Sequence, residues 1–277
     1  MSVPTPNTQN LKPETRNLSL VQISEDNVIN GDTMQDCFNE LGQQVGQPLE
    51  GWSPPPFPPH EPMEGRSCRL DPLDPERHAQ ELFEAYLLDE TGAMWTYLPV
   101  GPFADRESFD AFLGPASKKT DPLFYTIVDL GTGKAVGLAT YLRIDPTNGC
   151  IEVGFLTFSP LMQRTTVSTE AMYLMMKRAF ELGYRRYEWK CNACNEPSKT
   201  AALRLGFKYE GLFRQAVVTK GRNRDTAWYS VIDGEWPRLK AAFERWLDPA
   251  NFDAVGRQIE RLADLTRQCN ISDSAGL

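Results

Sequence analysis

The most informative part of this sequence reads Asn195-Glu-Pro-Ser-Lys-Thr-Ala-Ala-Leu-Arg-Leu-Gly-Phe-Lys-Tyr-Glu-Gly211. Asparagine is a preferred N-cap residue, proline is tolerated in the first helical turn, and glycine often follows the last turn. Asn195, Pro197 and Gly206 stand in those three places. The segment therefore predicts a helix over residues 196–205, followed by a strand over residues 207–214.

A second informative segment lies upstream, where Ile151-Glu-Val-Gly-Phe-Leu-Thr-Phe-Ser-Pro160 runs into the loop Leu161-Met-Gln-Arg-Thr-Thr-Val-Ser-Thr169. Its pattern predicts a strand over residues 150–158 and a helix over residues 167–182, with apolar side chains at helical spacing. A strand–loop–helix connection directs unpaired N–H groups and the positive end of the helix dipole at one point, which favours a phosphate anion. The loop lacks the Gly-Lys-Ser/Thr ending of a nucleotide-binding P-loop.

The remaining elements follow from hydrophobic spacing and turn signals. We expect strands over 66–70, 124–129, 135–143, 186–192 and 226–232, and helices over 74–88, 105–113, 235–246 and 252–267. This order is neither an alternating Rossmann array nor an all-β sandwich. It predicts a mixed α/β (α+β) domain.

Residues 1–65 differ from the rest of the chain in composition. They include the proline-rich run Ser53-Pro-Pro-Pro-Phe-Pro-Pro59, which forms neither a regular ladder nor a helix. Apolar patches at Leu18–Ile23, Trp52 and Phe57 favour an arm that lies across the domain, although a linker or a docking peptide is also open. We expect three parts: a Pro-rich extension (1–65), the main domain (66–247), and a C-terminal helix and tail (248–277).

Bulk properties exclude several classes of protein. A net charge of −8 disfavours nucleic acid and anionic membranes as partners, and no apolar run is long enough to span a bilayer. The N-terminus resembles neither a secretory signal nor a transit peptide, so we expect a cytoplasmic protein with reduced thiols. Cys191-x-x-Cys194 stands alone, which argues against a metal site. Two histidines leave little room for a His-based triad.

The two informative segments resemble the motifs of one known family, the GNAT N-acetyltransferases. The loop Gln163-Arg-Thr-Thr-Val-Ser168 is similar to the family's Gln/Arg-x-x-Gly-x-Gly/Ala loop, and the segment 195–211 is similar to its Asn-x-x-Ser…Leu-Gly-Phe-x-x-Glu-Gly signature. Thr169-Glu-Ala171, which follows the loop, resembles the form common in the branch of the ribosomal-protein alanine acetyltransferases. The resemblance covers residues 66–247. Thr166 stands where the family usually has glycine, and Ser168 replaces a second small residue.

The resemblance implies a fold and an activity. The fold is a central twisted, mostly antiparallel sheet flanked by helices, here with an irregular Pro-rich arm. The activity is transfer of an acetyl group from acetyl-CoA to a primary amine by direct attack, without a metal. The acceptor is a small molecule, an amino acid or a protein N-terminus, and the protein is a monomer or homodimer. Because Thr166 departs from the motif, a non-catalytic CoA-binding regulatory or scaffold protein is the alternative.

The resemblance also assigns residues to the CoA site. These are Leu156, Phe158, Gln163, Arg164, Thr165, Thr166, Val167, Ser168, Thr169, Asn195 and Ser198. The strand 150–158 would polarise the thioester carbonyl through backbone N–H groups, and the loop would hold the pyrophosphate. Thr166 and Ser168 would offer hydroxyl donors in place of the close backbone approach that glycine allows.

Acyl transfer to an amine also needs a base and an acid. We expect Glu152 to be the base, because burial in the strand would raise its pKa, with Asp225 as a second candidate for the base or for orienting a cationic acceptor. Ser198 is the expected acid beside the sulfur. Trp95, Tyr97, Trp189 and Arg222 are the expected acceptor-binding residues. For Trp95, Tyr97 and Trp189, packing in the core is an equal alternative.

Overall fold

The structure, a computed structural model, describes residues 37–274. Its main feature is an eight-stranded sheet with the strand order β3-β4-β5-β6-β7-β8-β10-β9. The strands are β3 (Met63–Glu64), β4 (Cys68–Pro72), β5 (Leu123–Asp129), β6 (Lys134–Asp145), β7 (Cys150–Phe158), β8 (Arg186–Asn192), β9 (Lys208–Thr219) and β10 (Arg222–Ile232). Neighbouring strands pair antiparallel except β7 and β8. The expectation of a mixed, mostly antiparallel sheet is confirmed.

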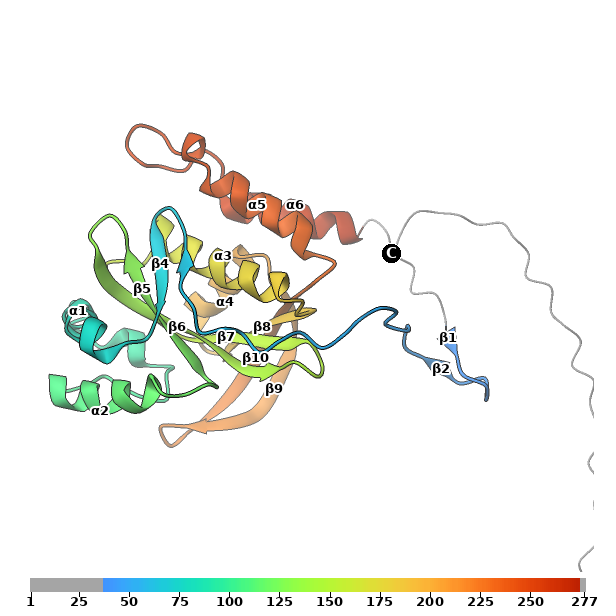
Figure 1. The fold of residues 1–277 in the computed structure, drawn as a ribbon, viewed down its shortest axis with the longest axis horizontal. Helices are drawn as coiled ribbons and strands as arrows, with labels where there is room; N and C mark the ends of the chain where they lie inside the picture. Colours follow the sequence, from blue (N-terminus) through green and yellow to red (C-terminus); the bar gives the residue numbers. More distant parts are fainter. Residues whose placement is uncertain (1–36, 275–277) are drawn as a thin grey trace, which may run out of the picture.

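Helices cover both faces of this sheet (Figure 1). They are α1 (Pro75–Leu87), α2 (Arg106–Ala116), α3 (Thr166–Glu181), α4 (Glu196–Arg204), α5 (Trp236–Leu247) and α6 (Leu262–Ser274), with short 3₁₀ turns η1 (Ala93–Trp95) and η2 (Pro249–Asn251). Successive strand residues face opposite sides. Accordingly Tyr125 packs in the core beneath α3 and α5, whereas Phe124 packs in a second core beneath α1 and α2.

The helix starts follow the capping signals in the sequence. Asp74 accepts hydrogen bonds from the backbone N–H groups of Glu76 and Arg77, and Asp105 forms a capping box with Ser108. Asn195 caps α4 through the N–H of Ser198. Because these bonds are local, the starts of α1, α2 and α4 were predictable to within one or two residues.

The parallel pair β7–β8 is short. It consists of four pairs, from Cys150↔Arg186 to Val153↔Trp189, and beyond Val153 the two strands diverge. A bulge reinforces the divergence, because Phe155 has a left-handed φ of 46° and the register with β6 shifts there. Phe155 consequently turns into the second core, where its ring packs against Phe112 and Phe124.

The proline-rich arm lies across the domain, as its apolar residues predict. Pro55 and Pro58 are buried. The hydroxyl of Tyr184 donates to the carbonyl of Pro56 (3.2 Å), and that of Tyr125 donates to the carbonyl of Pro59 (2.9 Å). The arm thus gives two buried tyrosine hydroxyls their acceptors. A two-residue pair, β1 (Cys37–Phe38) with β2 (Gln44–Val45), precedes it, and Leu18–Ile23 lie outside the described residues.

The predicted helix over 252–267 is wrong in its first half. Residues 252–261 form a loop with one β-bridge between Phe252 and Gln258, and α6 begins only at Leu262. The Asp253 carboxylate accepts from the N–H groups of Val255 and Arg257, which competes with helical hydrogen bonding. The last two strands are also longer than expected, and they form a hairpin that projects from the sheet (Figure 1).

Among residues 37–274, no helix is long and apolar enough to cross a membrane.

Candidate active site

A cleft of about 1950 Å³ opens where β7 and β8 diverge. Four segments form its walls: the end of β7 with the start of α3, the length of α4, the loop after α1, and the loop between α5 and α6. Of the expected CoA-site residues, all but Val167 line this cleft: Leu156, Phe158, Gln163, Arg164, Thr165, Thr166, Ser168, Thr169, Asn195 and Ser198. Segments far apart in the sequence therefore share one cleft.

The start of α3 forms one wall and has no side-chain cap. Its N-cap residue, Thr165, makes no capping hydrogen bond, and its hydroxyl donates backwards to the carbonyl of Met162 (2.7 Å). The Ser168 hydroxyl donates to the carbonyl of Thr165 (2.9 Å). The backbone N–H groups of the first turn therefore have no side-chain acceptor, and with the helix dipole they give this wall a positive partial charge.

The loop before α3 makes its turn without a glycine at position 166. Arg164 takes the left-handed conformation, with φ of 61°, while Thr166 is already the first helical residue. Gln163 braces the loop by donating from Nε2 to the carbonyl of Phe158 (2.8 Å). The side chain of Val167 is buried in the core, and this residue does not line the cleft.

The start of α4 forms the facing wall. Asn195 holds the first turn through its bond from the Ser198 N–H (3.2 Å). The indole Nε1 of Trp189 donates to the Ser198 hydroxyl oxygen (3.0 Å), and only 5% of Trp189 is exposed. Tryptophan N–H is a donor only, so the proton of the Ser198 hydroxyl remains available to another acceptor.

The loop between α1 and α2 lines one end of the cleft and is held by three hydrogen bonds to distant residues. The Tyr97 hydroxyl donates to the carbonyl of Cys194 (2.9 Å). The Lys220 ammonium, at the tip of the β9–β10 hairpin, donates to the carbonyls of Trp95 (2.9 Å) and Gly101 (2.8 Å). Nothing local in the sequence indicates these two bonds, because they join residues more than a hundred positions apart.

Three of the expected acceptor-binding residues occupy different environments. Trp95 is 3% exposed and packs edge-on against Tyr86 and Phe103, so its ring belongs to the second core. Tyr97 lines the cleft. Arg222 lies at the exposed tip of the hairpin, opposite Thr219.

Glu152 lies on the sheet face opposite to Ser198 and does not line the cleft. Its carboxylate is 5% exposed and lies 3.0 Å from Nζ of Lys190 and 3.3 Å from Nε of Arg143. Lys190 also pairs with Glu188 (2.6 Å) and stacks over the ring of Trp228. Burial raises the pKa of the Glu152 carboxyl, although the two cations oppose that shift.

The carboxyl of Glu152 nevertheless lies close to the point where β7 and β8 diverge. Oε1 lies 3.5 Å from the position that a Cβ would take on Gly154, the first residue of β7 beyond the last pair with β8. The side chain of Leu142 fills the space over Gly154, because its Cδ2 lies 2.9 Å from the same Cβ position. Glycine at position 154 therefore lets Leu142 and the Glu152 carboxylate pack close together.

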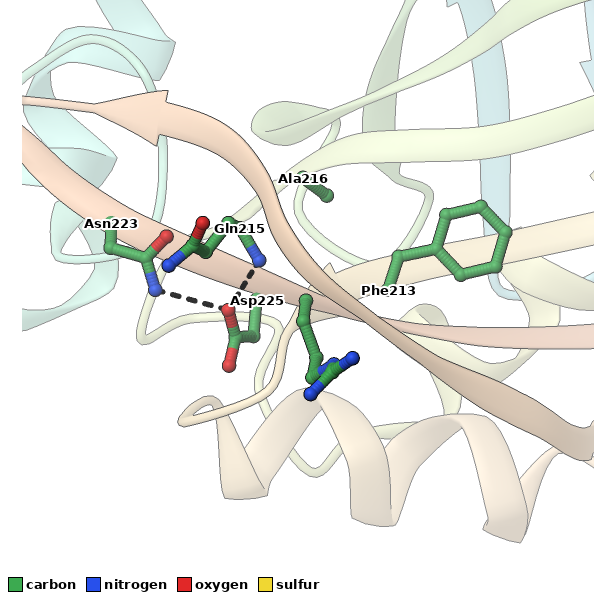
Figure 2. Close-up of a pocket in the computed structure, with 6 residues that line it drawn as sticks. Phe213, Gln215, Ala216, Asn223 and Asp225 are labelled. Carbon is green, nitrogen blue, oxygen red and sulfur yellow. Dashed lines mark hydrogen bonds between the residues drawn. The ribbon is translucent and has the colours of Figure 1, made fainter.

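Asp225 lies in a separate groove of about 710 Å³ on the β9–β10 hairpin (Figure 2). Its Oδ1 accepts from the N–H of Gln215 (2.7 Å) and from Nδ2 of Asn223 (3.0 Å), as the dashed lines in Figure 2 show. These hydrogen bonds lower the pKa of Asp225. Gln215 has a left-handed φ of 51°, so Asp225 braces a bulge in the hairpin.

The buried Cys191 has an environment that disfavours a nucleophile. Burial raises the pKa of its thiol, although contact with Ser198 opposes the shift. A protonated thiol is a weak nucleophile. Among residues 37–274, no group of three His, Cys, Asp or Glu side chains is placed to hold a metal ion.

Known proteins resemble this chain in both sequence and structure. The family model of the acetyltransferase (GNAT) domain matches residues 68–208. Over 101 residues, this chain is 29% identical in sequence to the ribosomal-protein-serine acetyltransferase of Escherichia coli (strain K12). That match covers 36% of this chain and 56%, little more than half, of the length of the relative.

Solved structures match over more of the chain. A GCN5-related N-acetyltransferase from Brucella melitensis is 47% identical, with a TM-score of 0.78, over 79% of this chain and 100% of the other. A probable acetyltransferase of the GNAT family from Chromobacterium violaceum ATCC 12472 is 40% identical, with a TM-score of 0.65, over 70% and 96% of the two chains.

Proposed function

Because the chain belongs to the GNAT acetyltransferase family, a family of acetyl-CoA-dependent enzymes, we propose that it transfers the acetyl group to a primary amine by direct attack. The divergence of β7 and β8 beyond Val153↔Trp189 carries this proposal. It opens one cleft with an uncapped helix start on one wall and the Ser198 hydroxyl on the other.

The two walls suit two different parts of acetyl-CoA, the pyrophosphate and the thioester. The N–H groups at the start of α3 suit the pyrophosphate, because a helix start attracts anions. The thioester then lies toward Ser198, at the start of α4. Backbone N–H groups of β7 beyond Val153 are free of β8 and are suited to polarise the thioester carbonyl.

Ser198 is the proposed acid. When the amine attacks the carbonyl carbon, the C–S bond breaks and the sulfur leaves as a thiolate that needs a proton. The Ser198 oxygen already accepts a hydrogen bond from Trp189, so its own proton points elsewhere and can move to the sulfur. The indole N–H also stabilises the oxygen after the proton has left.

Glu152 is the proposed base. The amine must lose a proton before or during attack, and a carboxylate with a raised pKa is better matched to that task than an exposed one. Its Oε1 lies beside Gly154, the residue at which β7 leaves β8, and this position supports a proton relay from the acceptor through one water. Asp225 suits the base role less well, because its hydrogen bonds lower its pKa and its Oδ1 braces the hairpin.

The end of the cleft near α1 supports a cationic acceptor. Asp89, Glu90 and Glu196 line it there, beside Tyr97. Burial alone would raise the pKa of Asp89, but hydrogen bonds from Met94 and Thr91 hold it lower, so this carboxylate stays charged. An ammonium group is attracted to such a rim before it is deprotonated.

The test is thiol release from acetyl-CoA by the full chain with a panel of primary amines: amino acids, small polyamines and peptides with free N-termini. We expect release that depends on both acetyl-CoA and one class of amine, with the acetyl group found on the amine nitrogen by mass spectrometry. Binding of acetyl-CoA without release by any amine in the panel would contradict amine transfer.

A further inference from the structure

An arginine cluster lies at the end of the cleft away from Glu196. Arg164, Arg204, Arg257 and Arg261 line it, from the α3 loop, the end of α4 and the loop between α5 and α6. Helix α4 runs along the cleft, so Glu196 and Arg204 are separated by roughly 12 Å of helix at 1.5 Å per residue. The cleft is therefore acidic near Ser198 and basic at its other end.

Three of these arginines have no carboxylate partner. Within residues 37–274, Arg164, Arg204 and Arg257 make no ion pair, although the chain has more carboxylates than cations. Arg204 instead donates to the Thr169 hydroxyl (3.1 Å) and stacks over the ring of Trp246. Like charges that gather without counter-charges repel one another, so this arrangement favours an anionic ligand.

The loop that carries Arg257 is stabilised by several side-chain hydrogen bonds and an ion pair. Asn251 bonds through its side chain to the carbonyls of Trp246 and Glu260 and to the N–H of Glu260. Trp246 Nε1 donates to Gln258 (2.7 Å), and Arg245 makes a two-point ion pair with Glu260. In Figure 1 the loop projects beyond the ends of α5 and α6.

Arg257 contributes to the loop's hydrogen bonds through its backbone and not through its side chain. The Asp253 carboxylate binds the backbone N–H of Arg257, and the carbonyl of Arg257 accepts from the N–H of Asp253. These bonds fix the backbone of Arg257, and the residue lines the cleft with its guanidinium in no ion pair within the described residues. The neighbouring Ile259, 66% exposed, adds an apolar surface at the same rim.

We propose that the loop Phe252–Arg261 binds the adenosine end of coenzyme A and that Arg257 binds its 3′-phosphate. The inference rests on the proposed function, which assigns the pyrophosphate to the start of α3. Coenzyme A carries a further phosphate on the ribose, away from the thioester, and this dianion needs its own cations. Guanidinium groups recognise phosphate through paired N–H donors. Arg204, which lines the same cleft, adds positive potential there.

Calorimetric titration of the full chain with acetyl-CoA and with 3′-dephospho-acetyl-CoA tests the proposal. We expect the wild type to prefer acetyl-CoA by about tenfold or more, the size of a charged hydrogen bond. Arg257→Ala should lose most of that preference and bind dephospho-acetyl-CoA as the wild type does. Arg267→Ala is the matched control, since it removes a charge from α6 that does not line the cleft.

The other outcomes are decisive as well. Equal binding of both ligands by the wild type would overturn the 3′-phosphate site and leave the proposed function standing. An undiminished preference in Arg257→Ala would overturn the role of Arg257. A wild type that binds neither ligand would overturn the proposed function and this inference together. Arg257→Lys, which keeps the charge but loses the paired donors, should retain an intermediate preference.

Discussion

The indole Nε1 of Trp189 lies 3.0 Å from the hydroxyl oxygen of Ser198, inside the cleft between β7 and β8. Trp189 holds its ring edge-on against Phe207, and Ser198 is held by the cap of α4. Both partners are therefore fixed by separate elements. This bond restricts the rotation of the Ser198 hydroxyl, which also contacts the Cys191 thiol.

Ser198→Ala should lower kcat by about 100-fold, the usual contribution of a positioned acid, with the affinity for acetyl-CoA unchanged. Trp189→Phe should lower kcat by a smaller factor, because it removes only the orienting donor. Thiol release at saturating substrates and calorimetric binding of acetyl-CoA check the two effects. Loss of binding in Ser198→Ala would contradict a role confined to proton transfer.

Glu152→Gln should lower kcat by about 100-fold at neutral pH and remove the acid limb of its pH profile. A base works only when deprotonated, and burial raises the pKa of Glu152, so wild-type kcat should fall as the pH drops through that raised value. Glu188→Gln is the control, because Glu188 belongs to the same ion-pair chain but is not among the atoms nearest to Gly154. It should keep the limb.

The same carboxyl should make stability depend on pH. Its folded-state pKa is above the ordinary value of 4.5, so the folded protein holds this proton while the unfolded chain has released it. The stabilising contribution is present below 4.5 and is lost as the pH rises through the folded-state pKa. Urea unfolding of the wild type and Glu152→Gln between pH 4 and 8 measures the difference. A parallel pH dependence in both would exclude the effect.

Gly154→Ala should lower kcat/KM for the acceptor by about tenfold, because the added methyl group would lie 3.5 Å from Oε1 of Glu152 and disturb the position of the carboxylate. The new Cβ would also lie 2.9 Å from Cδ2 of Leu142, which adds a packing clash. The double variant Gly154→Ala with Leu142→Val removes the clash and leaves the methyl group beside the carboxylate. Full recovery in the double variant would show that packing alone explains the loss.

Lys220→Met should raise the KM of the acceptor by about tenfold and leave the KM of acetyl-CoA unchanged, since two charged hydrogen bonds to the α1–α2 loop are lost. The exposed Lys134, on the distant β5–β6 turn, gives the matched control Lys134→Met. Initial-rate kinetics with each substrate varied separates the two constants. An equal rise in both KM values would indicate general loosening of the fold.

Several features could be predicted because their signals are local. Asp74, Asp105 and Asn195 cap their own helices within three residues, and the strand–loop–helix segment around Gln163 needs no distant partner. The helix over 252–267 failed for the opposite reason. Asn251 reaches the backbone of Glu260, nine residues away, and Asp253 binds the turn that follows it. Helical spacing of apolar residues does not report such bonds.

The order of the elements, the resemblance to the family, and most of the residues that line the cleft could be predicted from local patterns. Which side chains contact one another depends on how distant segments pack. Trp189 and Lys190 are neighbours on β8, yet one contacts Ser198 and the other contacts Glu152, because consecutive side chains on a strand leave opposite faces of the sheet. The same holds for Arg257, which reaches the cleft through the packing of a loop against α5.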